Sequence, residues 1–166
     1  GGITDIMARF MQEKLGRSLG QPIIVENKPG AGGIIAVDYV ARSAPDGYTL
    51  VMVNVSNAAI APWINKNLPY DPLNDFVGVA AVAEAPTVVA INDKVPAKTL
   101  KEFIEYAKAN PGKINYGSAG NGTGPHLAAE VLAHMTGMKM VHVPYKGAGP
   151  AAVDLAAGMV QLGMIA

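Results

Sequence analysis

Two glycine-rich segments lie where helices are expected to begin, and both carry residue types suited to binding an anion. The first is Gly1-Gly-Ile-Thr-Asp5 and the second is Ser118-Ala-Gly-Asn-Gly-Thr123. Glycine lets backbone amides approach a ligand closely, and the free N–H groups and dipole of a helix start favour negative charge. Two such segments facing each other across a cleft would hold a dicarboxylate without any arginine.

Asp5 has two interpretations at the first of these helix starts. A carboxylate beside an anion site repels the ligand unless it caps amides or orients water, whereas Asp at a helix start commonly caps the N-terminus. The frequency of such caps favours capping over ligand contact. The glycines also have a plain interpretation, turn formation, which the residues alone leave open.

A hydrolase is the main catalytic alternative. Its candidate residues are Ser56, Ser118, His126, His134, His142, Asp5 and Asp154. The Gly-x-Ser-x-Gly nucleophile elbow is absent, because Gly117 is directly adjacent to Ser118 in Tyr-Gly-Ser-Ala-Gly. Each histidine is better explained by a local hydrogen bond than by general base catalysis, so we expect no catalytic residue.

Metal and cofactor sites are not supported by the spacing. His126 and His134 are eight residues apart, about two helical turns, which is too far for both to bind one metal from a single helix. The run Gly30-Ala-Gly-Gly33 lacks the Gly-Lys-Ser/Thr ending of a phosphate-binding P-loop. The chain has no cysteine, which excludes disulfides and thiolate ligands. We therefore expect neither a metal nor a cofactor.

Composition excludes several further classes of function. Half of the 166 residues are hydrophobic, which favours a compact fold. Thirteen basic residues balance thirteen acidic ones, so no excess positive charge is available for nucleic acid or an anionic membrane surface. No apolar run approaches the roughly 20 residues that cross a bilayer, and the first residues do not resemble a secretion signal.

Periodicity predicts alternating helices and strands, typical of an α/β fold with mostly parallel sheets covered on both faces. Helices are expected over 3–19, through Val37 and Val40, from the capping box at Thr99 and Glu102 to 109, over 126–135, and from Pro150 to 157. Strands are expected over 22–25, 48–53, 76–83, 87–91, 114–117, 140–143 and 160–165.

Two features suggest how the chain is organised. Residues 28–38 resemble residues 146–154, as two related lobes would produce, although short Gly/Ala-rich turns also match by chance. The chain begins in a Gly-Gly turn and ends on an apolar strand. In a parallel sheet this would leave edges uncovered, so we expect further sequence at both ends or a partner chain.

Six ordered motifs resemble the Bug family of tripartite tricarboxylate transporter receptors. They lie at residues 1–5, 25–33, 44–50, 68–72, 115–123 and 141–147 and cover nearly the whole chain in collinear order. The resemblance implies a periplasmic-binding-protein type II-like fold of two α/β lobes that close on a ligand. It places lobe 1 at 1–95, without its first strand and returning segment, and the first part of lobe 2 at 96–166.

The resemblance also implies a function and a site. Its members are periplasmic receptors that deliver a small organic carboxylate to membrane permease subunits, without chemistry on the ligand. Carried over by position, the residues that would hold carboxylates or line the cleft are Gly1, Gly2, Thr4, Asp5, Ser56, Ser118, Ala119, Gly120, Asn121, Gly122, Thr123, His126 and Tyr145.

Three alternatives to this receptor remain at this stage. A hydrolase would use Ser118 with His126, and mutation of Ser118 would then abolish turnover. A truncated chain would fold without binding ligand, because the returning segment of the hinge is missing. A chain with uncovered edges would exchange elements with a second copy and form a homo-oligomer.

Overall fold

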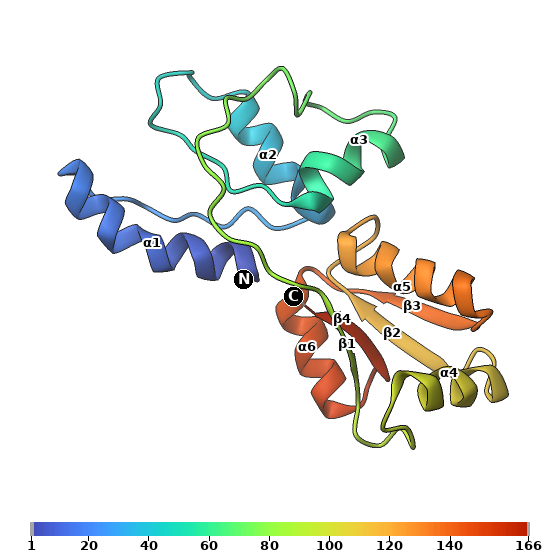
Figure 1. Ribbon diagram of the computed structural model, residues 1–166. Coiled ribbons are helices and arrows are strands. Elements are labelled where there is room, and N and C mark those ends of the chain that lie inside the picture. Colours follow the sequence, from blue (N-terminus) through green and yellow to red (C-terminus); the bar gives the residue numbers. More distant parts are fainter. Residues whose placement is uncertain (1, 166) are drawn as a thin grey trace. The chain divides into compact units, whose positions relative to one another are not determined.

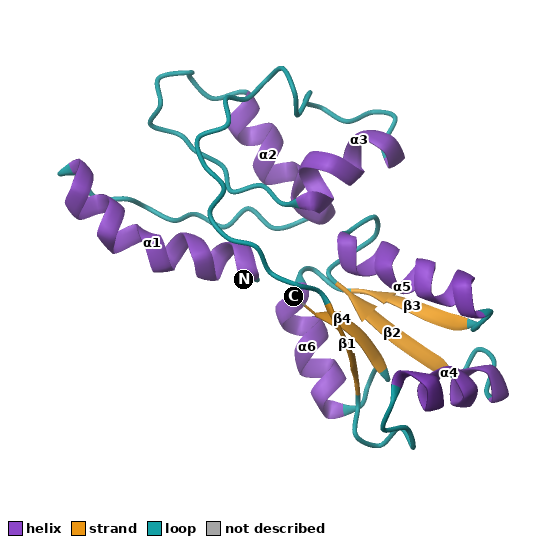
Figure 2. Ribbon diagram, in the orientation of Figure 1, coloured by secondary structure: helices purple, strands orange, loops and turns teal. Residues whose placement is uncertain are grey.

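The computed structural model describes residues 2–165 (Figures 1 and 2). The chain forms two compact units that divide between Ala85 and Pro86. The lobe boundary expected at 95/96 belongs to the architecture implied by the family resemblance and stays a prediction.

The first unit is built from helices and extended segments. Its elements are α1 (Ile3–Leu19), η1 (Ala31–Gly33), α2 (Ile34–Ala41), a π-helical turn η2 (Ser56–Ile60) and α3 (Ala61–Ile64). The helix predicted over 3–19 is confirmed, and it ends at Gly20, whose left-handed φ of 65° is accessible to glycine. The helix predicted through Val37 and Val40 is confirmed as α2.

The three strands predicted in this unit are wrong. Residues 22–25, 48–53 and 76–83 follow extended paths without strand pairing among the described residues. An apolar segment becomes a strand only when a neighbour supplies backbone partners. Ile24, Tyr48 and Val77 are each more than four-fifths exposed. Their apolar, β-rich composition marked these segments as fit for a sheet, and the described chain holds one sheet rather than several.

The second unit is an α/β domain whose elements were all predicted to within about two residues at each end. They are β1 (Val88–Ile91), α4 (Leu100–Ala109), β2 (Ile114–Ser118), α5 (Gly124–Thr136), β3 (Met140–Pro144), α6 (Ala148–Ala157) and β4 (Leu162–Ile165). The strand order is β1-β4-β2-β3. Strand β2 pairs in parallel with β3 and β4, whereas β1 runs antiparallel to β4.

The hydrophobic core of this unit joins one face of the sheet to α4 and α5. Tyr116 and Leu162, from neighbouring strands, are fully buried with Phe103 of α4 and Ala129 of α5. From β2 the chain passes through α5 to β3 on one side of β2. It then returns through α6 to β4 on the other side of β2. Since such crossovers are right-handed, α5 and α6 cover opposite faces of the sheet.

Two glycines allow α6 to lie close to its face. Gly117 and Gly163 are paired neighbours on β2 and β4. A Cβ added at Gly163 would lie 2.9 Å from Leu155 Cδ2, and one added at Gly117 would lie 3.3 Å from both Tyr145 and Val160. Close approach of the helix therefore requires a small residue at Gly163, while Gly117 leaves room for Tyr145 and Val160.

Helix α4 begins with the predicted cap in a modified form. The Thr99 hydroxyl accepts a hydrogen bond from the Glu102 amide at 3.2 Å. The Glu102 carboxylate accepts from the Lys98 amide at 2.6 Å rather than from the Thr99 amide that a capping box would use. Both bonds satisfy amides near the helix start.

We predict that Phe103→Ala lowers the free energy of unfolding by about 3–5 kcal/mol, because it removes a ring from a closed core. Leu100→Ala in the same helix removes a side chain that is half exposed, so its loss should stay below about 1 kcal/mol. Urea titration of both variants measures the difference. Equal losses would contradict the core described for this unit.

Candidate functional site

The second predicted helix start lies where β2 and β3 end side by side. Ser118 is the last residue of β2 and is in register with Pro144 at the end of β3. Tyr145 follows directly, and its amide donates to the Ser118 carbonyl at 3.0 Å. Residues 118–123, here called the β2–α5 loop, then lead into α5. The carboxyl edge of parallel strands is where open α/β sheets bind ligands.

The backbone of this loop alternates between paired and unpaired amides. The Gly120 amide donates to Ser118 Oγ at 3.1 Å, and the Gly122 amide donates to His126 Nδ1 at 3.0 Å. Among the described residues, the amides of Ala119 and Asn121 have no hydrogen-bond partner. Of the expected loop residues, Ala119 and Asn121 are therefore the ones with amides free for a ligand.

Two glycines with positive φ produce this alternation. Gly120 has a φ of 128° and Gly122 a φ of 72°, values that residues with a side chain rarely adopt. Successive amides in such a backbone form a concavity that suits an anion. The Thr123 hydroxyl donates to the Gly120 carbonyl at 2.7 Å, so this expected ligand contact is used inside the loop. Glycine and threonine here shape the loop.

Three stacked aromatic rings pack against the loop. His126 of α5 stacks on His142 of β3 with centroids 4.0 Å apart, and Tyr116 of β2 stacks on His142 at 4.8 Å. The Tyr116 hydroxyl hydrogen-bonds Glu130, one helical turn after His126. We call Tyr116, His126, His142 and Glu130 the histidine stack. The parallel register, which pairs Tyr116 with His142, brings these side chains together.

Burial determines the charge state within the stack. It lowers the pKa of His142 below the ordinary 6.5, and the neighbouring His126 lowers it further, while Glu130 acts in the opposite direction. Burial and then the bond to Glu130 raise the pKa of Tyr116 above its ordinary value. His142 is therefore neutral at pH 7 and Tyr116 keeps its proton.

The hydrolase alternative expected Ser118 beside His126, and the structure corrects this pairing. Ser118 Oγ lies 2.6 Å from His142 Nε2 instead. Ser118 is only 1% exposed, so its hydroxyl cannot reach a substrate. The acid considered for a triad, Asp154, accepts a hydrogen bond from the Tyr145 hydroxyl at 2.7 Å. The serine and histidine pair is thus a structural contact.

Tyr145 lies beside the loop, and its hydroxyl proton is used in a hydrogen bond to Asp154. The hydrogen bond to Asp154 raises the pKa of Tyr145 above its ordinary value. Asp154 belongs to α6, so the tyrosine ties the end of β3 to that helix. The oxygen of Tyr145 can still accept a hydrogen bond from a ligand.

The first predicted helix start belongs to the first unit. Gly2 is the N-cap of α1 and makes no side-chain capping bond. The amides of Ile3, Thr4 and Asp5 precede the first intrahelical bond, from the Ile6 amide to the Gly2 carbonyl. Asp5 lies in the first turn of α1 and accepts a hydrogen bond from Arg9 Nε at 2.8 Å, so the partner that the structure shows for it is a side chain. Gly1 lies outside the described residues.

Ser56 is buried at the start of η2, beside a residue that sequence reasoning missed. Asn57 is also buried, and its Oδ1 accepts from the Asn54 amide at 3.0 Å. A Cβ at Gly33 would lie 2.7 Å from Asn57 Nδ2, so Gly33 and Asn57 fix each other's position. The adjacent polar residues Ser56 and Asn57 interrupt the apolar run 51–61, and they were the available sequence signal for this contact.

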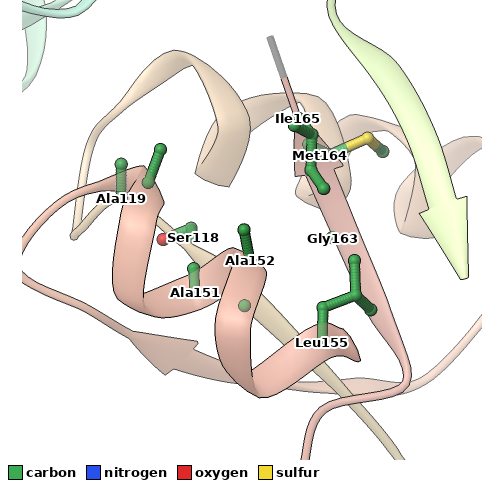
Figure 3. A pocket seen from close by; sticks show the side chains of 10 residues that line it. Ser118, Ala119, Ala151, Ala152, Leu155, Gly163, Met164 and Ile165 are labelled. Carbon is green, nitrogen blue, oxygen red and sulfur yellow. The ribbon is translucent and has the colours of Figure 1, made fainter. Parts of the chain in front are cut away.

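The enclosed space near the loop is small (Figure 3). A pocket between α6 and β4, bordered by Ser118, Ala119, Ala151 and Gly163, has a volume of about 10 Å³, room for about one water molecule. A carboxylate does not fit inside it. Within residues 2–165, no three His, Asp or Glu side chains converge as a metal site needs, and no helix of that range could cross a membrane.

Comparison with known proteins gives a consistent set of relatives. The family model described as tripartite tricarboxylate transporter family receptor matches residues 7–166. The chain is 41% identical over 165 residues to a UPF0065 protein of Bordetella pertussis, covering 99% of this chain and 51% of that protein. Protein BugT of the same organism is 41% identical over 96% of this chain and 49% of its own length.

Solved structures agree with the fold. One described as a periplasmic transporter is 49% identical, with a TM-score of 0.93, over 97% of this chain and 54% of that one. A Rhodopseudomonas palustris protein with adipate is 34% identical, with a TM-score of 0.95, over 99% and 55%. MatC of that organism, with bound malate, is 34% identical at 0.92 over 99% and 56%. The chain spans about half the length of these relatives.

The lowered pKa of His142 predicts how stability depends on pH. The unfolded chain takes up this proton near pH 6.5, whereas the folded protein does so only at lower pH. Between those two values the unfolded state binds more protons, so the free energy of unfolding falls as the pH drops. Above pH 6.5 both states are neutral and the full contribution is present.

We predict that His142→Gln removes this component of the pH dependence. Denaturant unfolding of both proteins between about pH 8 and about pH 5 gives the comparison. The stability difference between wild type and variant should shrink as the pH falls through this window. A constant difference would show that the folded protein protonates His142 as easily as the unfolded chain does.

Proposed function

Since the chain belongs to the tripartite tricarboxylate transporter receptor family, we propose that it captures a small organic carboxylate and passes it unchanged to the membrane permease subunits of such a transporter. The observation that carries this proposal is the pair of unpaired amides, Ala119 and Asn121, at the carboxyl edge of β2. Two relatives with solved structures hold adipate and malate, which are both dicarboxylates.

The chemistry of the loop suits a carboxylate held without a charged partner. Each amide donates one hydrogen bond, and the start of α5 adds the positive end of a helix dipole. The chain carries no net charge and the loop contains no Lys or Arg. Neutral donors hold an anion at modest cost and release it readily, as a receptor that passes on its ligand requires.

The first unit supplies the second half of the proposed grip. Gly2, Thr4 and Asp5 begin α1, where the helix leaves amides unpaired, and Gly1 precedes them in the sequence. In this proposal Thr4 and these amides hold one carboxylate of a diacid and the β2–α5 loop holds the other. In the same proposal Ser56, His126 and Tyr145 also contact the ligand.

Closure is part of the same proposal. Lobes at 1–95 and 96–166 would approach each other by a hinge motion that ligand contacts to both lobes stabilise. The proposed location is periplasmic, in keeping with the relative described as a periplasmic transporter. The whole receptor would include the remaining length seen in the relatives.

We predict that malate, adipate or another small diacid raises the thermal midpoint of the protein and that the matching diester does not. A ligand at about 100 times its dissociation constant adds roughly 2.7 kcal/mol to stability. The ester retains the carbon chain and removes the charge, so it separates carboxylate recognition from apolar binding. Equal shifts with acid and ester, or no shift with any acid in the panel, would contradict the proposal.

We further predict that Ser118→Ala weakens binding of the same acid by about 5- to 150-fold, because the Gly120 amide and His142 both lose a buried partner. Ser18→Ala, on an exposed position of α1, is the matched control and should bind as wild type does. Titration calorimetry at neutral pH gives both dissociation constants. An unchanged constant for Ser118→Ala would remove this residue from the site.

A further inference from the structure

Two stacked histidines fasten the β2–α5 loop near both of its ends. His142 Nε2 lies 2.6 Å from Ser118 Oγ at the beginning of the loop, and His126 Nδ1 accepts from the Gly122 amide near its end. The two rings are 4.0 Å apart and nearly parallel, at an interplanar angle of 20°. The two histidines that hold the loop are therefore in direct contact, so a change in one ring alters the environment of the other.

The hydrogen bond at Gly122 fixes the protonation of His126. A backbone N–H can only donate, so Nδ1 must carry a lone pair and the ring is the neutral tautomer with its proton on Nε2. An imidazolium carries a proton on both nitrogens and accepts nothing. Protonation of His126 therefore breaks the Gly122 bond, and a charge on either ring opposes a charge on the other.

The surroundings of His142 favour its neutral form. The titratable groups that face it are Tyr116 of β2 and Glu130 of α5, which bond to each other. Glu130 alone favours a positive charge on His142, but burial and His126 outweigh it and lower the pKa of His142. Tyr116 keeps its proton, which it shares with Glu130, and so the stack has no anion left without a partner.

We propose that His126 and His142 are positioning residues that form a proton-sensitive latch on the β2–α5 loop. While both are neutral, the loop presents the amides of Ala119 and Asn121. Protonation of the pair frees Gly122, loosens the loop and lowers the affinity for a carboxylate. This inference rests on the proposed function, because it assigns a pH response to the same site.

The test uses substitutions that keep each hydrogen bond but cannot be protonated. His126→Asn places an amide oxygen near the position of Nδ1, and His142→Gln places a polar atom near the position of Nε2. The probes are malate and adipate, measured by calorimetry from about pH 8 to about pH 5, a window that extends below the ordinary histidine pKa of about 6.5. Protonation of the ligand's own carboxyl groups affects wild type and variant alike, so the double variant corrects for it.

We predict that the wild-type affinity falls at least about five-fold more than that of the double variant across this range. The double variant lacks both rings, so it should show none of this additional fall, whatever its affinity at about pH 8. His126→Ala should bind weakly at every pH, and His126→Asn should restore the binding. Parallel pH profiles for wild type and double variant would overturn the latch. A wild-type affinity that rises on acidification would also overturn it, since that result indicates an ion pair with the ligand.

A measurement without ligand separates this inference from the proposed function. In ¹H–¹⁵N spectra the Gly122 amide signal should move with the same midpoint as the His126 ring signals, and it should stay constant in His126→Asn. If no acid binds at any pH, the proposed function fails, and this titration alone then decides the latch. A Gly122 signal that ignores His126 protonation overturns the latch whether or not a ligand binds.

Discussion

The parallel pairing of β2 with β3 is the constraint on which the candidate site depends. Its register sets Tyr116 beside His142 and Ser118 beside Pro144. Side chains alternate along a strand, so Tyr116, Ser118 and His142 share the face covered by α5, while Gly117 faces α6. A shift of one residue would turn the histidine away from Ser118 and place a tyrosine against α6, where Gly117 leaves no room for a side chain. The register of β2 and β3 therefore determines both the fold of this unit and the arrangement of the candidate site.

The sequence predicted the second unit well because its signals are local and agree with each other. The capping pair at Thr99 and Glu102 and the stop at 110–112 act within a single helix. The short apolar strands find their pairing partners inside the same unit. In the first unit the apolar runs at 22–25, 48–53 and 76–83 were wrongly predicted as strands, because strand formation requires a neighbouring backbone that the described chain does not provide. Helix α1 needs no such neighbour, and it was predicted to the residue.

The candidate site was likewise predictable from the sequence only in part. Glycine spacing located the β2–α5 loop correctly, since the positive φ angles of Gly120 and Gly122 are a property of residue type. Which amides remain unpaired follows from contacts with Ser118 and His126 that only the fold reveals. The role of His142 was hidden for the same reason, because 24 residues separate it from Ser118 and only the strand pairing joins them. Sequence thus indicated where the site lies, and tertiary structure determined which atoms face a ligand.

A loop that must hold an anion without arginine depends on the exact direction of a few amides. Backbone dipoles lose strength steeply when they are misaligned, so the loop needs rigid support more than it needs charge. The histidine stack gives that support with partly buried rings whose nitrogens form hydrogen bonds to Ser118 and Gly122. Support of this kind has a chemical consequence, because imidazole is the one side chain whose ordinary pKa lies near neutrality. Serine or asparagine in the same role would leave the loop indifferent to pH, whereas the proposed latch makes the geometry of the loop depend on the proton concentration around it.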